Sequence, residues 1–452
     1  MRLITLAGCS FYIFNACVTA PVATEFLNRM GFTELEFGMI SGIPMIMLCL
    51  QFGSALLNTH VVTRRKPWFV LFISLSRLVL IPLALTPVLF PFGSRESHIQ
   101  FIIMLTCISS ATGNLTTPLW YSWLADLIPH PILNRFWSRR ERVLQITSIS
   151  AAMAVAVATY CAQRFGLDVI PFFILLTCVG CVAGITDMLL YLRIHEPPHV
   201  APDKQSIVAS IFQPLIHREY RSFILFSCAF SAVTSFAAAF MLLYTLKELK
   251  ISLWQTSLMW MCPAIGVVMA VTAWGRLADR HGQKPILEIC SWFKPGIALI
   301  FLLVTPGTAL WVMPLALLLD GMLNSGIMIA SNGYMLKMAP QNNRAMFIAF
   351  ITGLAGICGG LAAMAGGVFL NQTAGVRLTA FDRTWNHYHL LFLISFLLRF
   401  IPVYLARRIR EPEVSDQTMI VNDLVKMWPL RALRYPVGLY RRITGSSDTQ
   451  PW

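Results

Sequence analysis

The sequence has little charge, and negative charge is the scarcer kind. Of its 452 residues only 12% are Asp, Glu, Lys or Arg, and 21 acidic residues stand against 35 basic ones, for a formal net charge of +14. Soluble domains carry about 25% charged residues. A chain with half that share cannot cover a water-facing surface of this size, which excludes a soluble enzyme, a disordered chain and a coiled coil.

Signatures of catalysis and of tight metal binding are also missing from the sequence. We find no nucleotide-binding loop, no cluster of metal ligands and no nucleophile–base set, so we expect no enzymatic activity, no ATP-driven pumping, no metal and no cofactor. The 11 cysteines are scattered singly through apolar segments and form no disulfide framework. Cys178 and Cys181 have redox-pair spacing, but they lie in an apolar helix without a nearby histidine, which favours packing.

Long hydrophobic runs are what the sequence does contain. Hydrophobic residues make up 56% of the chain and the mean hydropathy is +0.66. About 20 apolar residues are needed to cross a bilayer as a helix. We therefore predict an all-α polytopic membrane protein with twelve spans, at about 4–27, 36–59, 67–91, 99–127, 141–164, 168–193, 221–246, 254–278, 285–306, 309–336, 344–370 and 387–408.

A polar stretch after the sixth span divides the chain into two halves. The predicted domains are an N-terminal six-helix bundle at 1–194, a linker at 195–220, a C-terminal six-helix bundle at 221–409 and a basic amphipathic tail at 410–452. The two halves resemble each other, because the basic turn Arg64-Arg65-Lys66-Pro67 recurs as Gln283-Lys284-Pro285 at an offset of 218. Such a parallel repeat predicts a substrate path between two pseudo-symmetric bundles.

The basic residues gather on one side of the predicted membrane. By our count, 25 of the 35 Lys and Arg residues fall on the side that includes both termini, 7 on the other side, and 3 inside spans. Cytoplasmic loops are enriched in Lys and Arg. We therefore expect both termini and the linker to be cytoplasmic, in a multi-pass cell membrane protein, with the bacterial inner membrane as its location. This distribution also explains the basic excess better than nucleic-acid binding does.

One ten-residue turn between the eighth and ninth spans carries a family signature. It reads Gly275-Arg276-Leu277-Ala278-Asp279-Arg280-His281-Gly282-Gln283-Lys284 and resembles the G-x-L-a-D-r-x-G-r-k motif of the major facilitator superfamily. The physics suits a tight turn: Gly282 can adopt positive φ, Gly275 lets the helix approach a neighbour, and Asp279 can sit at a helix N-terminus. The resemblance implies a conformational latch formed by Gly275, Asp279, Arg280, Gly282 and Lys284.

The matching loop of the first half departs from this motif. It lacks the acid and retains only Arg64, Arg65 and Lys66. Asp126, at the end of the fourth span, can pair with Arg64 or Arg65 and replace the lost latch. A capping carboxylate beside a basic loop explains Asp126 equally well, and both interpretations stay open.

The resemblance also implies that the first, fourth, seventh and tenth spans line a central cavity. Polar residues at membrane depth are costly and therefore functional candidates, although small polar residues also join helices by hydrogen bonds. On these four spans the candidate cavity residues are Asn15, Thr19, Asn114, Thr117, Trp120, Tyr121, Thr234, Ser235, Asp320, Asn324 and Ser331.

Acidic residues inside the spans are the candidates for energy coupling. Asp320 lies about 25 Å from the end of its span near Lys337, at ~1.5 Å per residue, and could take up and release a proton. Glu25, near the outer end of the first span, is the second candidate. For Arg77, Asp187, Lys294 and Arg399 we expect structural roles: an Arg77–Asp187 ion pair, and Lys294 and Arg399 snorkelling to the cytoplasmic face.

The leading functional prediction is a secondary active transporter, a symporter or antiporter, that moves a small solute by alternating access, coupled to protons. The alternatives are a facilitated uniporter and a non-transporting receptor or scaffold that retains the fold. The mixed neutral lining favours an uncharged or zwitterionic solute. We expect a monomer without nucleic-acid partners, whose tail lies on anionic lipids of the inner leaflet or is disordered.

Overall fold

The computed structural model describes residues 2–19, 21–54, 64–127, 133–196, 213–216, 218–338, 344–380 and 383–411. Twelve helical segments in this part of the chain are long and apolar enough to cross a membrane. They fall at the twelve predicted positions, so the expected all-α polytopic architecture is confirmed. Both the predicted linker and the tail beyond Glu411 lie largely outside the described residues.

The helices of the N-terminal half follow in chain order. They are α1 (Arg2–Val18), α2 (Pro21–Arg29), α3 (Glu34–Ile46), the short 3-10 turn η1 (Met47–Cys49), α5 (Arg65–Leu78), α6 (Leu80–Ala84), α7 (Thr86–Leu89), α8 (Arg95–Leu127), α9 (Leu133–Arg164) and α10 (Val169–Leu192).

The C-terminal half contains α12 (Arg218–Lys247), α13 (Leu253–Met259), α14 (Cys262–His281), α15 (Lys284–Leu303), α16 (Pro306–Met338), α17 (Arg344–Thr373), α18 (His387–Leu398) and α19 (Phe400–Arg408). A two-stranded antiparallel hairpin, β1 (Arg377–Ala380) and β2 (Arg383–Asn386), joins α17 to α18, with Arg377 opposite Asn386.

Local sequence signals explain where several of these helices begin and bend. Thr33 and Glu36 form a capping box at the start of α3, which satisfies backbone N–H groups that a helix N-terminus leaves unpaired. The first span breaks into α1 and α2 just before Pro21, and the eighth breaks into α13 and α14 just before Pro263. Proline lacks the N–H that a continuous helix needs.

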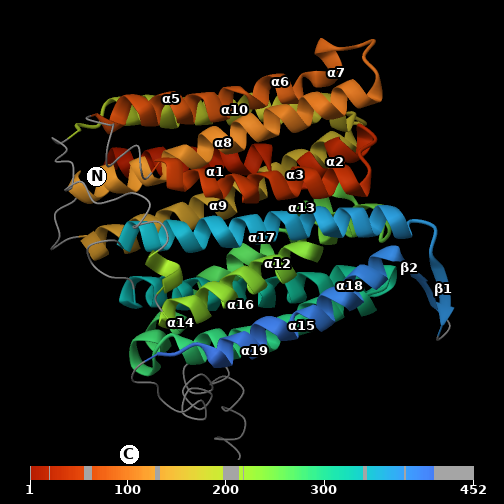
Figure 1. The fold of residues 1–452 in the computed structure, drawn as a ribbon. Coiled ribbons are helices and arrows are strands. Elements are labelled where there is room, and N and C mark those ends of the chain that lie inside the picture. The colour runs from red at the N-terminus through yellow and green to blue at the C-terminus, as the bar shows by residue number, and fades with distance from the viewer. Residues whose placement is uncertain are drawn as a thin grey trace, which may run out of the picture.

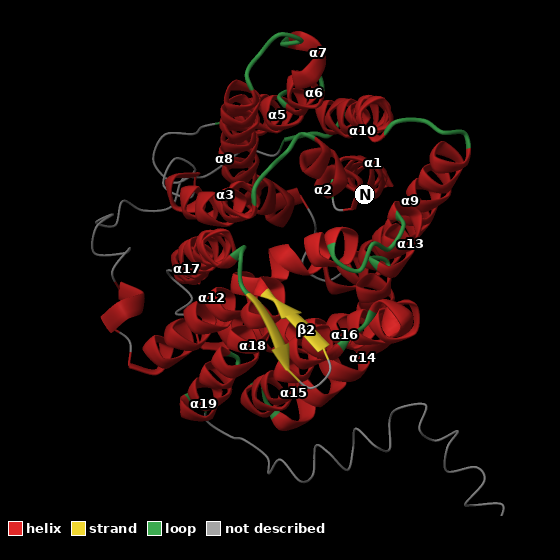
Figure 2. Ribbon diagram, turned by 90° about the vertical axis from the view of Figure 1, so that its right-hand side faces the viewer, coloured by secondary structure: helices red, strands yellow, loops and turns green. Residues whose placement is uncertain are grey.

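The two halves stand side by side with their helices running in the same general direction (Figures 1 and 2). We call the end that carries Arg65, Lys66, Lys284 and Lys337 the basic end; it lies at the left of Figure 1. The opposite end carries the hairpin, at the right of Figure 1 and nearest the viewer in Figure 2.

Glycines bring α3 and α17 together across the two halves. A Cβ atom on Gly38 would lie 3.1 Å from the Cα of Gly367, and one on Gly42 would lie 2.5 Å from the carbonyl oxygen of Gly360. Real side chains do not fit at these distances, so glycine is required for the two backbones to approach so closely. This seam between α3 and α17 is a principal contact between the halves.

Candidate functional site

Asp320 is the centre of a polar cluster inside the C-terminal half. Its carboxylate on α16 accepts a hydrogen bond from Lys294 Nζ on α15 at 2.5 Å and from Asn324 Nδ2, one turn along α16, at 2.8 Å. The side chain of Lys294 is only 4% exposed, whereas that of Asp320 is 22% exposed. The pair therefore has one buried, cationic member and one acidic member that is partly exposed.

Arg399 belongs to the same cluster and corrects one expectation. Its guanidinium donates to the backbone carbonyl of Lys294 at 2.9 Å, and both side chains are buried. The prediction that Lys294 and Arg399 snorkel to the membrane surface is therefore wrong. The prediction considered depth along one helix, but the anionic partner stands on a neighbouring helix, α16.

The N-terminal half contains a second buried ion pair, at the position expected from the sequence. Arg77 on α5 pairs with Asp187 on α10, and it also donates to the carbonyl of Gly184 at 2.6 Å. The Arg77 guanidinium lies 5.1 Å from the centre of the Phe14 ring on α1. Both charged side chains are about 95% buried, so the pair lies inside its half, away from the exposed surface.

The candidate cavity residues of the N-terminal half mostly contact their own half. The Asn114 side chain on α8 accepts from Gln51 and donates to the carbonyl of Ser110. Trp120 donates to the Tyr191 hydroxyl at 2.6 Å. Asn15 and Thr117 are partly exposed, whereas Thr19 is exposed and bonds back to the Asn15 carbonyl. The side chain of Tyr121 lies outside the described part of the structure.

The candidates on α12 and α16 differ in what surrounds them. Ser235 is buried and donates to the Met45 thioether of α3 at 3.4 Å, so it joins the two halves. Thr234, next to it, is partly exposed, as are Asn324 and Ser331 on α16. The structure thus leaves several candidates partly exposed and places others at helix contacts.

Glu25 is engaged locally. It accepts from Arg29 Nε at 2.9 Å and from Asn28 Nδ2 at 3.2 Å, all on α2. A carboxylate held by a neighbouring, largely exposed arginine is a surface ion pair. Of the two coupling candidates, Asp320 therefore has the more unusual environment.

A carboxylate that the sequence analysis did not select joins the two halves at the opposite end. Glu34, the first residue of α3, accepts from Lys247 Nζ at the end of α12 and from the Tyr388 hydroxyl on α18, both at 3.1 Å. At the same end, the rings of Tyr160 on α9 and Trp254 on α13 meet edge to face at 5.3 Å between centroids. These contacts close the halves against each other at this end.

The turn expected to form the latch lies at the basic end, and its latching role stays a prediction. Gly282 has φ +86°, as the tight turn requires, but Asp279 and Arg280 are exposed. A Cβ atom on Gly275 would meet no described atom within 4 Å, so the expectation of a close helix neighbour there is wrong in this structure. The side chain of Asp126 lies outside the described residues, and so does any pairing with Arg64 or Arg65.

Glutamates at the ends of the sixth and twelfth spans occupy the helix N-termini instead. Glu411 accepts from the backbone N–H groups of Gln283 and Lys284 at 2.8 and 2.7 Å, and Lys337 Nζ lies 3.5 Å away. In the first half, Glu196 accepts in the same way from the N–H groups of Arg65 and Lys66. Anions are stabilised at helix N-termini because unpaired N–H groups and the helix dipole meet there.

The sequence carried a signal for this pair of caps. Arg193-Ile194-His195-Glu196-Pro197 and Arg408-Ile409-Arg410-Glu411-Pro412 share the pattern R-I-x-E-P at an offset of 215, close to the offset of the other repeats. This repeat lies just beyond the last span of each half, outside the spans and turns that indicated the duplication.

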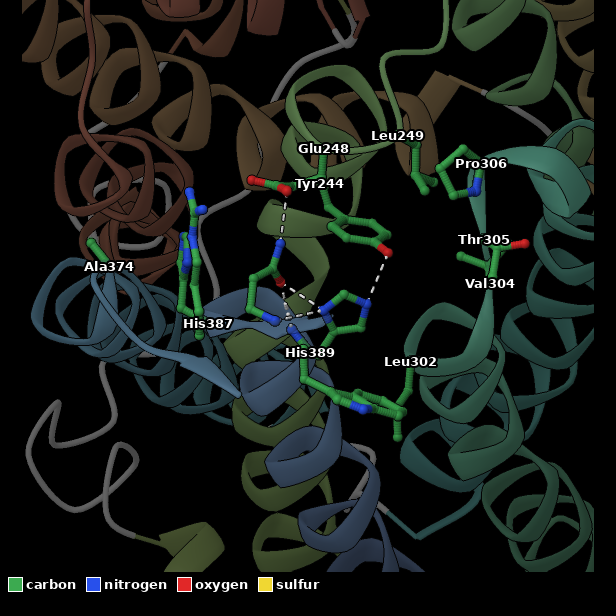
Figure 3. Close-up of a pocket in the computed structure, with 13 residues that line it drawn as sticks. Tyr244, Glu248, Leu249, Leu302, Val304, Thr305, Pro306, Ala374, His387 and His389 are labelled. Atoms are coloured by element: carbon green, nitrogen blue, oxygen red, sulfur yellow. Dashed lines mark hydrogen bonds between the residues drawn. The ribbon is translucent and has the colours of Figure 1, made fainter. Parts of the chain in front are cut away.

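A cavity of about 620 Å³ opens at the opposite end within the C-terminal half (Figure 3). His389 stands in it between the Tyr244 hydroxyl, 3.3 Å from Nε2, and the side-chain oxygen Oδ1 of Asn386, 2.7 Å from Nδ1. Asn386 donates to Glu248 at 2.7 Å. Trp385, His387 and Arg377 complete the polar and aromatic lining.

The model of the Major Facilitator Superfamily matches residues 3–367 and, in a second overlapping match, residues 223–439. The chain belongs to the Major Facilitator Superfamily. Membership agrees with the signature at Gly275–Lys284 and with the twelve spans of two halves. No curated protein matches the sequence closely enough to count as a relative.

Solved transporters of the superfamily share the fold. The nucleoside transporter NupG has 14% sequence identity with this chain, with 90% of this chain and 99% of that one covered, at a TM-score of 0.64. The D-xylose-proton symporter has 15% identity, with 92% and 97% covered, also at 0.64. At these identities the likeness shows the fold alone.

A bacterial homologue of the iron transporter ferroportin shares the fold in two conformations. Its inward-facing structure aligns with a TM-score of 0.61 and its outward-facing structure with 0.56, each at 14% identity and with 90% of this chain and 96% of that one covered.

Proposed function

We propose that this protein is a secondary active transporter that carries a small solute through the membrane by alternating access, with proton coupling at Asp320. The observation that carries the proposal is the asymmetry of the Lys294–Asp320 pair. The acid is partly exposed while its cationic partner is buried, so a proton can reach the Asp320 carboxylate. Protonation removes the negative charge and breaks the ion pair with Lys294. Polar groups at membrane depth are kept where function requires them.

The contacts at the opposite end support the alternating-access part of the proposal. Glu34, Lys247 and Tyr388 close that end with three polar side chains. A few charged contacts are weak enough to break during a transport cycle. With the basic end cytoplasmic, as the positive-inside rule indicates, this arrangement corresponds to an inward-facing state. The higher TM-score with the inward-facing ferroportin homologue supports the same assignment.

The solute we propose is uncharged or zwitterionic. Among the candidate cavity residues, Asn15, Thr117, Thr234, Asn324 and Ser331 are partly exposed amides and hydroxyls. The only acid in the set, Asp320, is neutralised by Lys294. Amide and hydroxyl groups recognise hydroxyl-rich or amide-bearing solutes by paired hydrogen bonds. The nucleoside and D-xylose transporters with the same fold act on molecules of this kind.

A ligand screen followed by transport assays tests the proposal. Purified protein is screened by thermal shift against nucleosides, sugars, amino acids and carboxylates, because a ligand at about 100 times its Kd stabilises the folded state by ~2.7 kcal/mol. Hits are then tested in proteoliposomes for counterflow and for uptake driven by a pH gradient. Counterflow without driven uptake would identify a uniporter. Binding without counterflow would identify a receptor, and either result would overturn the proposal.

A further inference from the structure

The cavity at the opposite end has two exposed charges of opposite sign in its lining. Glu248, which follows α12, accepts a hydrogen bond from Asn386 at one carboxylate oxygen, and its other oxygen has no hydrogen-bond donor among the described residues. Arg377, the first residue of β1, has neither a hydrogen-bond nor an ion-pair partner in the described part of the chain. The cavity therefore offers a ligand both a carboxylate oxygen and a guanidinium group.

Asn386 adjoins both of these charged residues. It stands opposite Arg377 in the hairpin register, so the two side chains leave the same face of the hairpin. Its Nδ2 donates to Glu248 at 2.7 Å, and its Oδ1 accepts from the backbone N–H of His389 at 3.3 Å. Asn386 is thus fixed at the start of α18, and a ligand with one cationic and one anionic group can pair with the charge on each side of it.

The rest of the lining suits an apolar group on the same ligand. Figure 3 shows Leu249, Leu302 and Val304 along one side of the cavity, away from His387. We call these three buried residues the apolar wall. Trp385 adds an indole ring. The volume of about 620 Å³ lies within the range of about 300–1,000 Å³ found for small-molecule sites.

The two histidines of the lining do not make the cavity a metal site. Across the described residues, no group of three or more His, Cys, Asp or Glu side chains could hold a metal ion. Both ring nitrogens of His389 are already engaged, by the Tyr244 hydroxyl and by Asn386. The lining therefore fits an organic molecule better than a bare cation.

We propose that this cavity binds a zwitterionic amino acid with an apolar side chain. The ammonium group donates to Glu248, the carboxylate accepts from Arg377, and the side chain packs against the apolar wall. Hydrogen bonds between charged groups are roughly twice as strong as neutral ones, and a guanidinium can bind a carboxylate through two parallel N–H groups.

Calorimetric titration of the purified, full-length wild-type protein tests the proposal without any variant. The probes are L-phenylalanine and L-leucine, and the controls are N-acetyl-L-phenylalanine, which lacks the ammonium group, and L-phenylalaninamide, which lacks the carboxylate. We expect each control to bind at least about tenfold more weakly than L-phenylalanine. Equal affinity for L-phenylalanine and both controls would overturn the proposal, as would no binding of either amino acid.

Two variants assign each charge to its partner. Glu248→Gln should no longer prefer L-phenylalanine to its N-acetyl derivative, and Arg377→Gln should no longer prefer it to the amide. The matched control is Lys250→Gln, which removes an exposed cation two residues from Glu248 that does not line the cavity. This control should keep both preferences. If Glu248→Gln and Arg377→Gln keep them too, the amino acid binds elsewhere and the proposal is wrong.

The site is separate from the one proposed for proton coupling. Pro306, at the start of α16, lines the cavity, and Asp320 lies about 21 Å further along that helix at ~1.5 Å per residue. We therefore expect Asp320→Asn to bind L-phenylalanine with wild-type affinity, so that the two proposals stand or fall independently. Loss of binding in Asp320→Asn would contradict the placement of the amino acid in this cavity.

Discussion

At the scale of single residues, the two halves use buried charge in different ways. In the N-terminal half, Arg77 and Asp187 are both almost fully buried. In the C-terminal half, Lys294 is buried but Asp320 is partly exposed. Breaking a buried ion pair costs about 3–5 kcal/mol, because one charge is left without compensation. The Arg77–Asp187 pair is therefore suited to hold a structure, and the Lys294–Asp320 pair to respond to a proton.

Replacing Asp320 with Asn separates the hydrogen bond to Lys294 from the uptake of a proton. The amide oxygen can still accept a hydrogen bond from Lys294, but it cannot take up a proton at physiological pH. We expect Asp320→Asn to abolish pH-gradient-driven uptake and to spare counterflow, both measured in proteoliposomes with a ligand from the screen.

Two further variants control this experiment. Asp187→Asn disrupts the other buried pair and should lower the thermal stability while driven uptake per folded molecule is retained. The double variant Asp320→Asn/Lys294→Met removes both charges and should recover stability without recovering driven uptake. Driven uptake at the wild-type rate in Asp320→Asn would show that the proton binds elsewhere.

The depth of each charged residue within its span, counted from the sequence, predicted the Arg77–Asp187 pair but not the Lys294–Asp320 pair. Arg77 and Asp187 lie in the same half at similar depths, so their pairing followed from counting. Lys294 and Arg399 also lie at similar depths, but they carry the same charge. Lys294 pairs with Asp320 on a third helix, α16, and Arg399 donates to the backbone carbonyl of Lys294. Contacts among three helices depend on how those helices pack. The depth of a residue within its own span carries no information about that packing.

At the scale of elements, the glutamate caps fix where two helices begin. Glu411 is fully buried and bonds two N–H groups at the start of α15, and Glu196 does the same for α5. Each glutamate follows the last span of its half and binds the start of the third span of that half, α5 or α15. These contacts hold the basic end of each bundle together from within.

The element-scale prediction concerns these caps. Replacing Glu411 with Gln leaves a hydrogen-bond acceptor but removes the negative charge at the N-terminus of α15. We therefore expect the free energy of unfolding to fall by about 0.5–2 kcal/mol, the range measured when a helix loses its N-cap. The measurement is the thermal unfolding midpoint of the purified protein.

Glu196→Gln is the matched variant in the other half. The two glutamates share no partner, so their effects on the free energy of unfolding should add in the double variant. An unchanged midpoint in Glu411→Gln would mean that the carboxylate contributes nothing to the folded state.

At the scale of the whole molecule, the hydrophobic lengths predicted twelve spans, because a membrane imposes the same requirement on every crossing helix. The ten-residue signature then pointed to the superfamily. The contacts between the halves could not be predicted in the same way. Glu34, Lys247 and Tyr388 are far apart in the sequence and sit at the ends of three different spans, where a charged residue is unremarkable.

The whole-molecule prediction concerns closure at the opposite end. Glu34→Gln removes the charge that holds Lys247 and weakens the bond from Tyr388. We expect the closed arrangement to be destabilised relative to the open one by about 1–2 kcal/mol. The ratio of closed to open molecules should therefore fall roughly five- to thirtyfold. Hydrogen–deuterium exchange should then increase at the start of α3 and at the end of α12.

Glu36→Gln provides the control for closure. Glu36 lies on the same turn of α3 but pairs with Arg95 of its own half at 2.8 Å, so its loss should leave exchange at the end of α12 unchanged. Equal exchange at α12 in the wild type and in Glu34→Gln would show that Glu34 does not keep this end shut.

The glycine seam between α3 and α17 has a mechanical consequence. Where Gly38 and Gly42 face Gly367 and Gly360, one main chain rests directly on another, and the side chains of Ile46 and Met364 lie beside the glycines. At these positions the two helices can tilt over each other with few side chains to displace. The seam can therefore serve as a low-friction pivot, about which the bundles rock while the lipid-facing surface of each one stays intact.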